Sequence, residues 1–214
     1  MTTAALSPGL PELLRLGTRE LHAATERSGA MAALLGGRLS HAGYVALLRN
    51  LHALYAALET ALDARQADPA VAPLRPRPLY RAAALAADLQ ILHGPRWADE
   101  LPLQPAAVAY VARLQALARA ASPALVAHAY VRYLGDLHGG QVLKRLVVRH
   151  LGLGDATGLR FYEFGSEPEV LALRTHLRQA LGALPLDAAA QDGVVAEARW
   201  AFVQHQRLFE ELPA

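Results

Sequence analysis

The length, composition and charge of the chain limit what it can be. It has 214 residues, of which 53% are hydrophobic and 19% charged, so it suits one sizeable globular domain and is not disordered. Its net charge is +2, too small to favour a nucleic-acid partner. It contains no cysteine, which excludes disulfides, thiolate zinc sites and iron–sulfur clusters and is compatible with a cytoplasmic location.

Two further features concern targeting and domain boundaries. Residues 1–8 lack the basic stretch and apolar core of a secretory signal peptide. No window reaches about 18 uncharged apolar residues, so we expect no membrane span. The proline-rich stretch 69–78 is short, is expected to be non-helical, and has helical patterns on both sides. Without a boundary or a repeat, residues 1–214 are expected to form one domain.

The first helix is expected over about 13–27. Four of its polar residues are spaced 4, 3 and 4 apart and therefore share one face: Arg15, Arg19, His22 and Glu26. Two interpretations stay open. The face is either a solvated charged stripe, or it carries a metal ligand, His22, oriented by the Glu26 carboxylate, with the arginines as an anion clamp.

Hydrophobic periodicity predicts further helices along the rest of the chain. They are expected over about 41–64, 81–94, 105–119, from Ser122-Pro123 to Gly152 or Gly154, from Pro168, and over about 186–212. Ser40 is expected to cap the first of these, and Tyr55 lies on its buried side, where a core tyrosine is the default. Asp88 is expected to pair with a basic group. Arg174 and Arg178, four residues apart, are by themselves typical of surface charge.

The segment 127–146 is apolar and helix-like at both ends but not in the middle. Its middle holds three glycines around two polar residues: Gly135, Asp136, His138, Gly139 and Gly140. Each glycine inside a helix costs about 0.5–1 kcal/mol relative to alanine. Either a helix ends at Leu134 and a loop carries the glycines, or the helix continues and lets something flat and bulky come close. Spacing favours the loop, whereas the absence of proline and of a polar turn after Gln141 favours continuation.

Two segments resemble a known family. The run Ala127-His-Ala-Tyr-x-Arg-Tyr-Leu-Gly-Asp-Leu-x-Gly-Gly-Gln-Val-Leu143 resembles the distal-helix motif of the heme oxygenases, and Leu21-His-Ala-x-x-Glu26 resembles their proximal segment. Less specific matches extend the resemblance over about residues 10–212.

The resemblance implies a fold and an activity. The fold is an all-α single domain of eight or nine helices, with heme sandwiched between a proximal helix and a glycine-kinked distal helix. Heme b is both cofactor and substrate, and its ring is opened with O2 at a meso carbon to give biliverdin, carbon monoxide and ferrous iron. Because no flavin or nicotinamide site is evident, the electrons are expected to come from a ferredoxin, a flavodoxin or a reductase.

The resemblance also implies roles for individual residues. His22 is expected to bind the heme iron. Asp136, Arg132 and Tyr55 are expected to form a proton-delivering network on the oxygen side. Heme contacts are expected from Arg15, Arg19, Glu26, Tyr130, Gly135, His138, Gly139, Arg174, Arg178 and Phe202.

One residue departs from the family pattern. Position 138 usually holds serine or another small residue, and here it is His138. At 100° per residue it lies about 60° around the helix from Gly135. Its ring either packs or hydrogen-bonds at the rim of the distal pocket, or it touches bound ligand or water.

Three rival functions remain to be weighed against an oxygenase. A heme carrier or sensor needs His22 and the arginines but not Asp136. A di-iron carboxylate bundle usually needs Glu-x-x-His twice, and no glutamate in this chain is followed by histidine three residues later. A helical scaffold without a cofactor has no need for glycines in the middle of a long helix.

Overall fold

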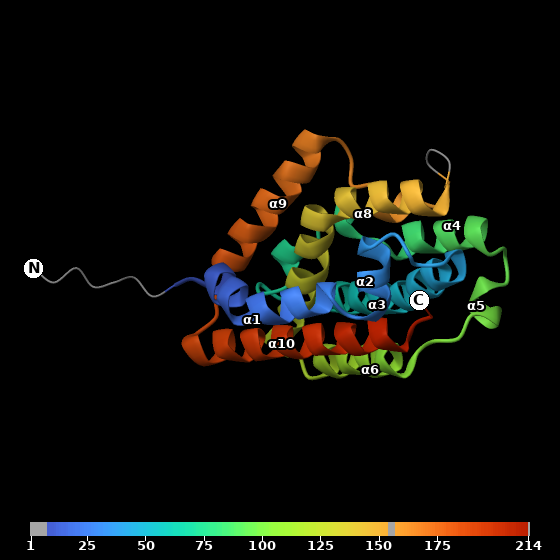
Figure 1. Ribbon diagram of the computed structural model, residues 1–214. Coiled ribbons are helices and arrows are strands. Elements are labelled where there is room, and N and C mark those ends of the chain that lie inside the picture. The colour runs from blue at the N-terminus through green and yellow to red at the C-terminus, as the bar shows by residue number, and fades with distance from the viewer. Residues whose placement is uncertain (1–7, 154–156, 214) are drawn as a thin grey trace, which may run out of the picture.

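The computed structural model describes residues 8–153 and 157–213, and within them it contains helices and connecting loops but no strand (Figure 1). The α-helices are α1 (Leu10–Glu26), α2 (Gly29–Leu35), α3 (His41–Ala64), α4 (Ala82–Leu92), α5 (Trp97–Glu100), α6 (Pro105–Arg119), α7 (Val126–Ala129), α8 (Gly135–Leu151), α9 (Glu167–Gly182) and α10 (Ala188–Glu211). Short helical turns are η1 (Ala72–Leu74), η2 (Arg77–Leu79), η3 (Pro123–Leu125), η4 (Tyr130–Leu134) and η5 (Arg160–Tyr162). The all-α prediction is confirmed.

Local capping explains where several helices begin. The Ser40 hydroxyl accepts the backbone N–H of Gly43 at 3.0 Å, which confirms the predicted cap of α3. Asp187 accepts the N–H of Ala190 at 2.8 Å at the start of α10. These side chains bond N–H groups that would otherwise lack partners, so the residue just before each helix determines where α3 and α10 begin.

Four local predictions need correction. The first helix begins at Leu10, and the stretch 69–78 contains the two single-turn helices η1 and η2 instead of being wholly non-helical. The short helices α2 and α5 were not predicted. Asp88 accepts the backbone N–H groups of Arg160 and Phe161 at 2.9 and 2.8 Å, so its hydrogen-bond partners are amides and not a basic side chain.

Helices α1 and α10 pack against each other along much of their length (Figure 1). A side chain at Gly17 would place its Cβ 2.7 Å from a methyl of Val195, so the close approach requires glycine. The Arg199 guanidinium donates to the carbonyl of Gly17 at 2.7 Å, and the Gln206 amide donates to that of Leu21 at 3.2 Å. These contacts hold α1 in place along the molecule.

The glycine-containing segment is helical, so the loop interpretation is wrong. One helical run extends through η3, α7, η4 and α8, and η4 is a single π-helical turn just before Gly135. In Figure 1 the run changes direction between its olive first part and its yellow second part, as helices do at π-turns and glycines. It ends at Gly152, whose φ of 62° suits glycine, while the alternative end at Gly154 lies outside the described residues.

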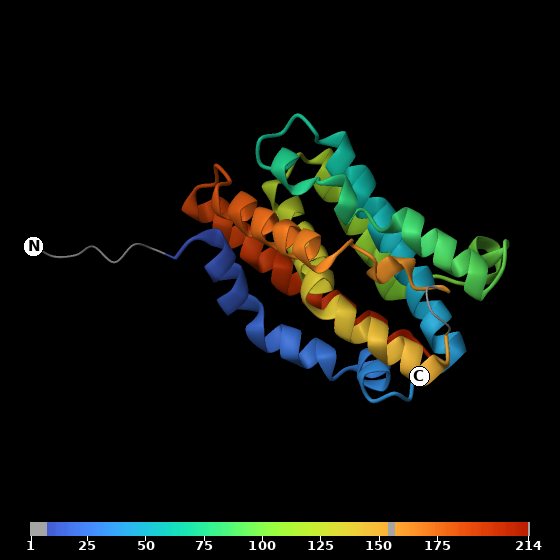
Figure 2. The same ribbon diagram turned by 90° about the horizontal axis from the view of Figure 1, so that it is seen from above.

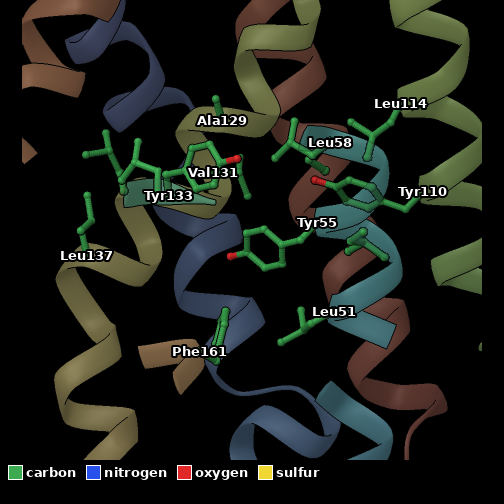
Figure 3. Close-up of a cluster of buried hydrophobic side chains, with 14 of the residues drawn as sticks. Leu51, Tyr55, Leu58, Tyr110, Leu114, Ala129, Val131, Tyr133, Leu137 and Phe161 are labelled. Carbon is green, nitrogen blue, oxygen red and sulfur yellow. The ribbon is translucent and has the colours of Figure 1, made fainter. Parts of the chain in front are cut away.

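Part of the hydrophobic core lies between α3, α6 and this helical run (Figure 3), and residues of α1, α2, α9 and α10 belong to the same core. In the view of Figure 2 the yellow part of the run passes between blue α1 and blue-green α3. Tyr55 is fully buried and reaches from α3 toward the run, with Tyr133 and Phe161 at ring-centroid distances of 6.1 and 5.8 Å (Figure 3). Packing on both sides leaves the ring little freedom, so its hydroxyl has a defined position.

Candidate active site

A cavity of about 750 Å³ lies between α1 and α8, within the usual range of about 300–1,000 Å³ for small-molecule sites. Helices α2, α3, α9 and α10 and the turns η4 and η5 complete its wall. Apolar side chains supply much of the lining, among them Met31, Leu34, Leu47, Leu51, Phe161, Phe202 and Phe209. The cavity therefore suits a largely apolar ligand with a few polar attachment points.

Most of the residues singled out from the sequence line this cavity. They are Arg15, His22, Glu26, Tyr130, Arg132, Gly135, Asp136, His138, Gly139, Arg178 and Phe202. Tyr55 lies behind the wall and reaches the cavity through Asp136. Arg19 and Arg174 are not among the lining residues. The predicted residues therefore lie together at one cavity, except for the two arginines Arg19 and Arg174.

On the α1 side, His22 presents an accessible imidazole to the cavity. Its side chain is 54% exposed, and its ring meets the edge of Phe202 at a centroid distance of 5.7 Å. Nδ1 lies 3.8 Å from a carboxylate oxygen of Glu26, close enough for electrostatic attraction but too far for a hydrogen bond. Nε2 accepts and donates no hydrogen bond among the described residues and is therefore available for a metal, while the orientation of the ring by Glu26 stays a prediction.

On the opposite side, Gly135 and Gly139 leave open space. A Cβ added at either position would meet no atom within 4 Å outside its own helix backbone. Neither glycine has a positive φ, so the backbone does not require glycine there. Neither packing nor backbone geometry therefore explains why these two positions hold glycine.

A buried polar network borders the cavity beside these glycines. The Tyr55 hydroxyl donates to one carboxylate oxygen of Asp136, and Arg132 donates to the other at 3.1 Å. Arg132 also donates through Nε to the Tyr55 hydroxyl at 3.0 Å. Burial raises the pKa of Asp136 above its ordinary value, and Arg132 and Tyr55 oppose that shift. The three residues predicted to act together are therefore in direct contact.

Sequence reasoning missed one residue of this network, His205. Its Nε2 lies 3.2 Å from Nη1 of Arg132, and its ring is 2% exposed at the cavity wall. The sequence does contain a signal, because His205 is an ionisable residue on the mainly apolar face of α10 that includes Ala201 and Leu208.

His138 is held at the cavity rim by its own helix. Its Nδ1 donates to the carbonyl of Leu134 at 2.7 Å. Since the carbonyl can only accept, Nδ1 carries the hydrogen and Nε2 is left with the lone pair in the neutral ring. The rim hydrogen bond matches the first of the two predicted roles, and contact with a ligand stays a prediction.

The four arginines predicted to contact a ligand differ in their hydrogen-bond partners and in whether they line the cavity. Arg15 donates to both carboxylate oxygens of Glu12, at 2.9 and 2.7 Å, and lies at the cavity together with Arg178. Arg19 is exposed, and Arg174 has a buried Nε without a hydrogen-bond partner. Guanidinium groups at the mouth suit carboxylate substituents on a ligand.

Among residues 8–153 and 157–213, no group of three or more histidine, cysteine, aspartate or glutamate side chains is placed to hold a metal ion by itself. In the same residues no helix combines the length and apolar character needed to cross a membrane.

Residues 9–211 match the model of the family described as heme oxygenase. The chain belongs to the heme oxygenase family. It is 35% identical over 207 residues to heme oxygenase 1 of Nostoc. The aligned region covers 97% of this chain and 87% of that relative.

Two solved structures extend the match to three dimensions. The heme oxygenase-2 of Synechocystis in complex with heme and NO superimposes with a TM-score of 0.91 at 34% identity, covering 95% of this chain and 85% of that one. The heme oxygenase of Leptospira interrogans gives a TM-score of 0.91 at 32% identity, covering 96% and 100%.

The predicted family, enzyme class and use of heme are thereby confirmed. The residues present also fit heme: an apolar cavity has an imidazole on one wall, two glycines with empty space on the other, and arginines at its mouth. The roles of individual residues stay predictions.

Proposed function

We propose that this cavity binds heme b with its iron on His22 and opens the ring at a meso carbon to biliverdin, carbon monoxide and ferrous iron. The observation that carries the proposal is the empty space over Gly135 and Gly139 on the wall opposite His22. When bound, heme supplies both the iron that binds O2 and the carbon that is oxidised.

Other side chains of the cavity orient His22 and bind the carboxylates of the ligand. Glu26 orients the ring of His22 by electrostatic attraction, and Phe202 packs against the edge of that ring. Arg15, Arg178 and Tyr130 neutralise and hydrogen-bond the carboxylates of the ligand. Arg15 must exchange its contact with Glu12 to do so, which an exposed ion pair allows at little cost.

Asp136 is the residue proposed to move protons. A carboxylate has about four acceptor sites on its two oxygens, and Tyr55 and Arg132 occupy one site on each oxygen. The remaining sites allow Asp136 to hold a proton-carrying water in the cavity. A heme carrier has no use for such a network, so its presence favours the oxygenase over the carrier.

The electrons and the cellular location complete the proposal. Electrons are expected from a separate ferredoxin, flavodoxin or reductase, and O2 from solution. A cytoplasmic location rests on the absence of cysteine, which is compatible with a reducing compartment.

The role of His22 is tested with His22→Ala. We expect weaker hemin binding, a changed ferric spectrum, and recovery of the original spectrum when imidazole is added, because free imidazole can replace the missing ligand. His41→Ala, which removes an exposed histidine outside the cavity wall, is the control and is expected to behave like the unchanged protein. If His22→Ala kept both the affinity and the spectrum, the assignment of His22 would be wrong.

A further inference from the structure

Arg132 is held by three hydrogen bonds, one from each of its nitrogens. Nε donates to the Tyr55 hydroxyl at 3.0 Å, and Nη2 donates to Asp136 at 3.1 Å. Nη1 faces Nε2 of His205 at 3.2 Å. The Arg132 side chain is only 13% exposed, so water is a poor substitute for any of these acceptors. Together the three acceptors fix the plane of the guanidinium.

The surroundings of His205 determine which of its nitrogens carries the hydrogen. Nδ1 lies 2.8 Å from the carbonyl oxygen of Ala201, which can only accept, so Nδ1 is the donor. Nε2 faces a guanidinium, which can only donate, so Nε2 is the acceptor. Burial and the nearby charge of Arg132 lower the pKa of His205 to about 3. The ring is therefore a neutral acceptor at physiological pH.

We propose that His205 is a positioning residue that holds the Arg132 guanidinium in the orientation in which it serves both Tyr55 and Asp136. Its effect on ring opening rests on the proposed role of Asp136. The positioning itself is a property of the protein without heme and can be measured there.

A purely structural role is the rival explanation. The His205 ring meets Tyr110 edge-on at a centroid distance of 5.1 Å and lies 6.0 Å from Phe209, so it also fills core space. The two explanations differ in what they require at position 205. Packing requires volume, whereas positioning requires a hydrogen-bond acceptor directed at Arg132.

The test compares variants that separate acceptor from volume. His205→Gln keeps a side-chain acceptor of similar reach, whereas His205→Leu and His205→Phe have none. The measurement is the hydrogen-exchange rate of the Arg132 Nε–H, followed by ¹⁵N NMR in the heme-free protein. Loss of one charge-assisted hydrogen bond predicts exchange about tenfold faster in the Leu and Phe variants. The Gln variant is expected to stay close to the unchanged protein.

The control is another buried histidine. His128 is fully buried and bonds to Tyr110 and Glu197 at 2.8 and 3.1 Å, but it does not contact Arg132 through a hydrogen bond. His128→Leu should therefore leave the exchange of Arg132 nearly unchanged. Should His205→Leu fail to fold, His205→Phe provides the same comparison with an aromatic ring retained.

Two outcomes separate the positioning role from the proposed function. Unchanged exchange at Arg132 in a folded variant without an acceptor would overturn the positioning role. The Leu and Phe variants at position 205 are expected to bind heme and to open its ring about tenfold more slowly, whereas His205→Gln is expected to open it at nearly the rate of the unchanged protein. If the unchanged protein bound heme but did not open it, the proposed function would fail, and the exchange rates would still decide the role of His205.

Discussion

At the scale of single residues, the wall of the cavity places one buried carboxylate where it can hold water. Asp136 accepts hydrogen bonds from Tyr55 and Arg132, and burial raises its pKa. A carboxyl group with both a fixed position and a shifted pKa is well suited to move protons.

Asp136→Asn should therefore separate binding from chemistry. The substitution keeps the shape but removes the charge and the proton, so we expect heme affinity close to that of the unchanged protein and ring opening slower by about 10²-fold or more. The measurements are a hemin titration and the rate of biliverdin formation. Asp99→Asn, an exposed change outside the cavity, is the control. Normal turnover in Asp136→Asn would exclude Asp136 from the proton path.

His138 poses a different question, because its Nδ1 is already bonded to Leu134. We expect His138→Ser to leave the absorption spectrum of the ferric heme complex unchanged, since the histidine is held at the rim. A change of that spectrum from six-coordinate to five-coordinate would show instead that His138 binds the iron.

The low pKa of His205 has a consequence for stability. In the unfolded chain His205 takes up a proton below its ordinary pKa of 6.5, whereas in the folded protein it stays neutral down to about pH 3. The free energy of unfolding therefore decreases as the pH falls from about 6.5 to about 3. Between about pH 7.5 and about pH 5.5 this one group is expected to account for about 1.4 kcal/mol. Urea unfolding of the heme-free protein at both pH values should show this loss, reduced by that amount in His205→Gln. An equal loss in both proteins would mean that His205 is not a neutral buried ring.

At the scale of elements, the central helical run contains residues with low helix propensity where it borders the cavity. Gly135 and Gly139 are unfavourable for a helix, and nothing in the protein occupies the space over them. Both glycines line the cavity, so a ligand lying against the helix would use the space over them.

Gly139→Ala should consequently have two effects of opposite sign. A methyl group there meets no neighbour in the heme-free protein, so the free energy of unfolding should rise by roughly 0.5–1 kcal/mol. Heme affinity should fall, because the methyl group occupies space meant for the ligand. Gly193→Ala in α10 is the matched control: its added Cβ is equally free of contacts and lies away from the cavity, so it should raise stability alone. A Gly139→Ala protein with unchanged heme affinity would contradict the proposed position of the ligand.

The same run also shows the limit of prediction from local sequence. The cap at Ser40 and the proline at Pro105 act within a few residues, and the helices that they begin were predicted closely. The spacing of the glycines alone favoured a loop at 135–140, whereas the absence of proline and of a polar turn after Gln141 favoured a continuous helix, and the structure has the helix. No local pattern indicated the π-helical turn at 130–134.

At the scale of the whole molecule, the site depends on contacts between distant parts of the chain. The two walls of the cavity could be predicted from the sequence, because each wall contains one short motif, around His22 and around Asp136. The bond between Arg132 and His205 joins residues 73 positions apart, and no spacing rule could predict it. Arg19 was chosen from helical spacing and from the resemblance, and Arg174 from the resemblance alone. Helical spacing places a residue on a face but does not say how the helix is rotated toward a cavity.

The arrangement of helices turns this set of residues into a single site. Close packing of α1 against α10 at Gly17 holds the His22 wall, and the bent run carrying α8 forms the facing wall. The cavity between them is therefore formed by the fold before any ligand binds, which lowers the conformational cost of binding.

The central claim is that this chain binds heme and opens its ring. The most direct test mixes the purified protein with one equivalent of hemin, then adds ascorbate in air with an iron chelator and with catalase to remove free peroxide. We expect the Soret band to form and then to disappear as a biliverdin absorption grows. A Soret band that persists in the presence of reductant and oxygen would contradict ring opening and indicate a heme carrier, and the absence of any Soret shift would contradict heme binding itself.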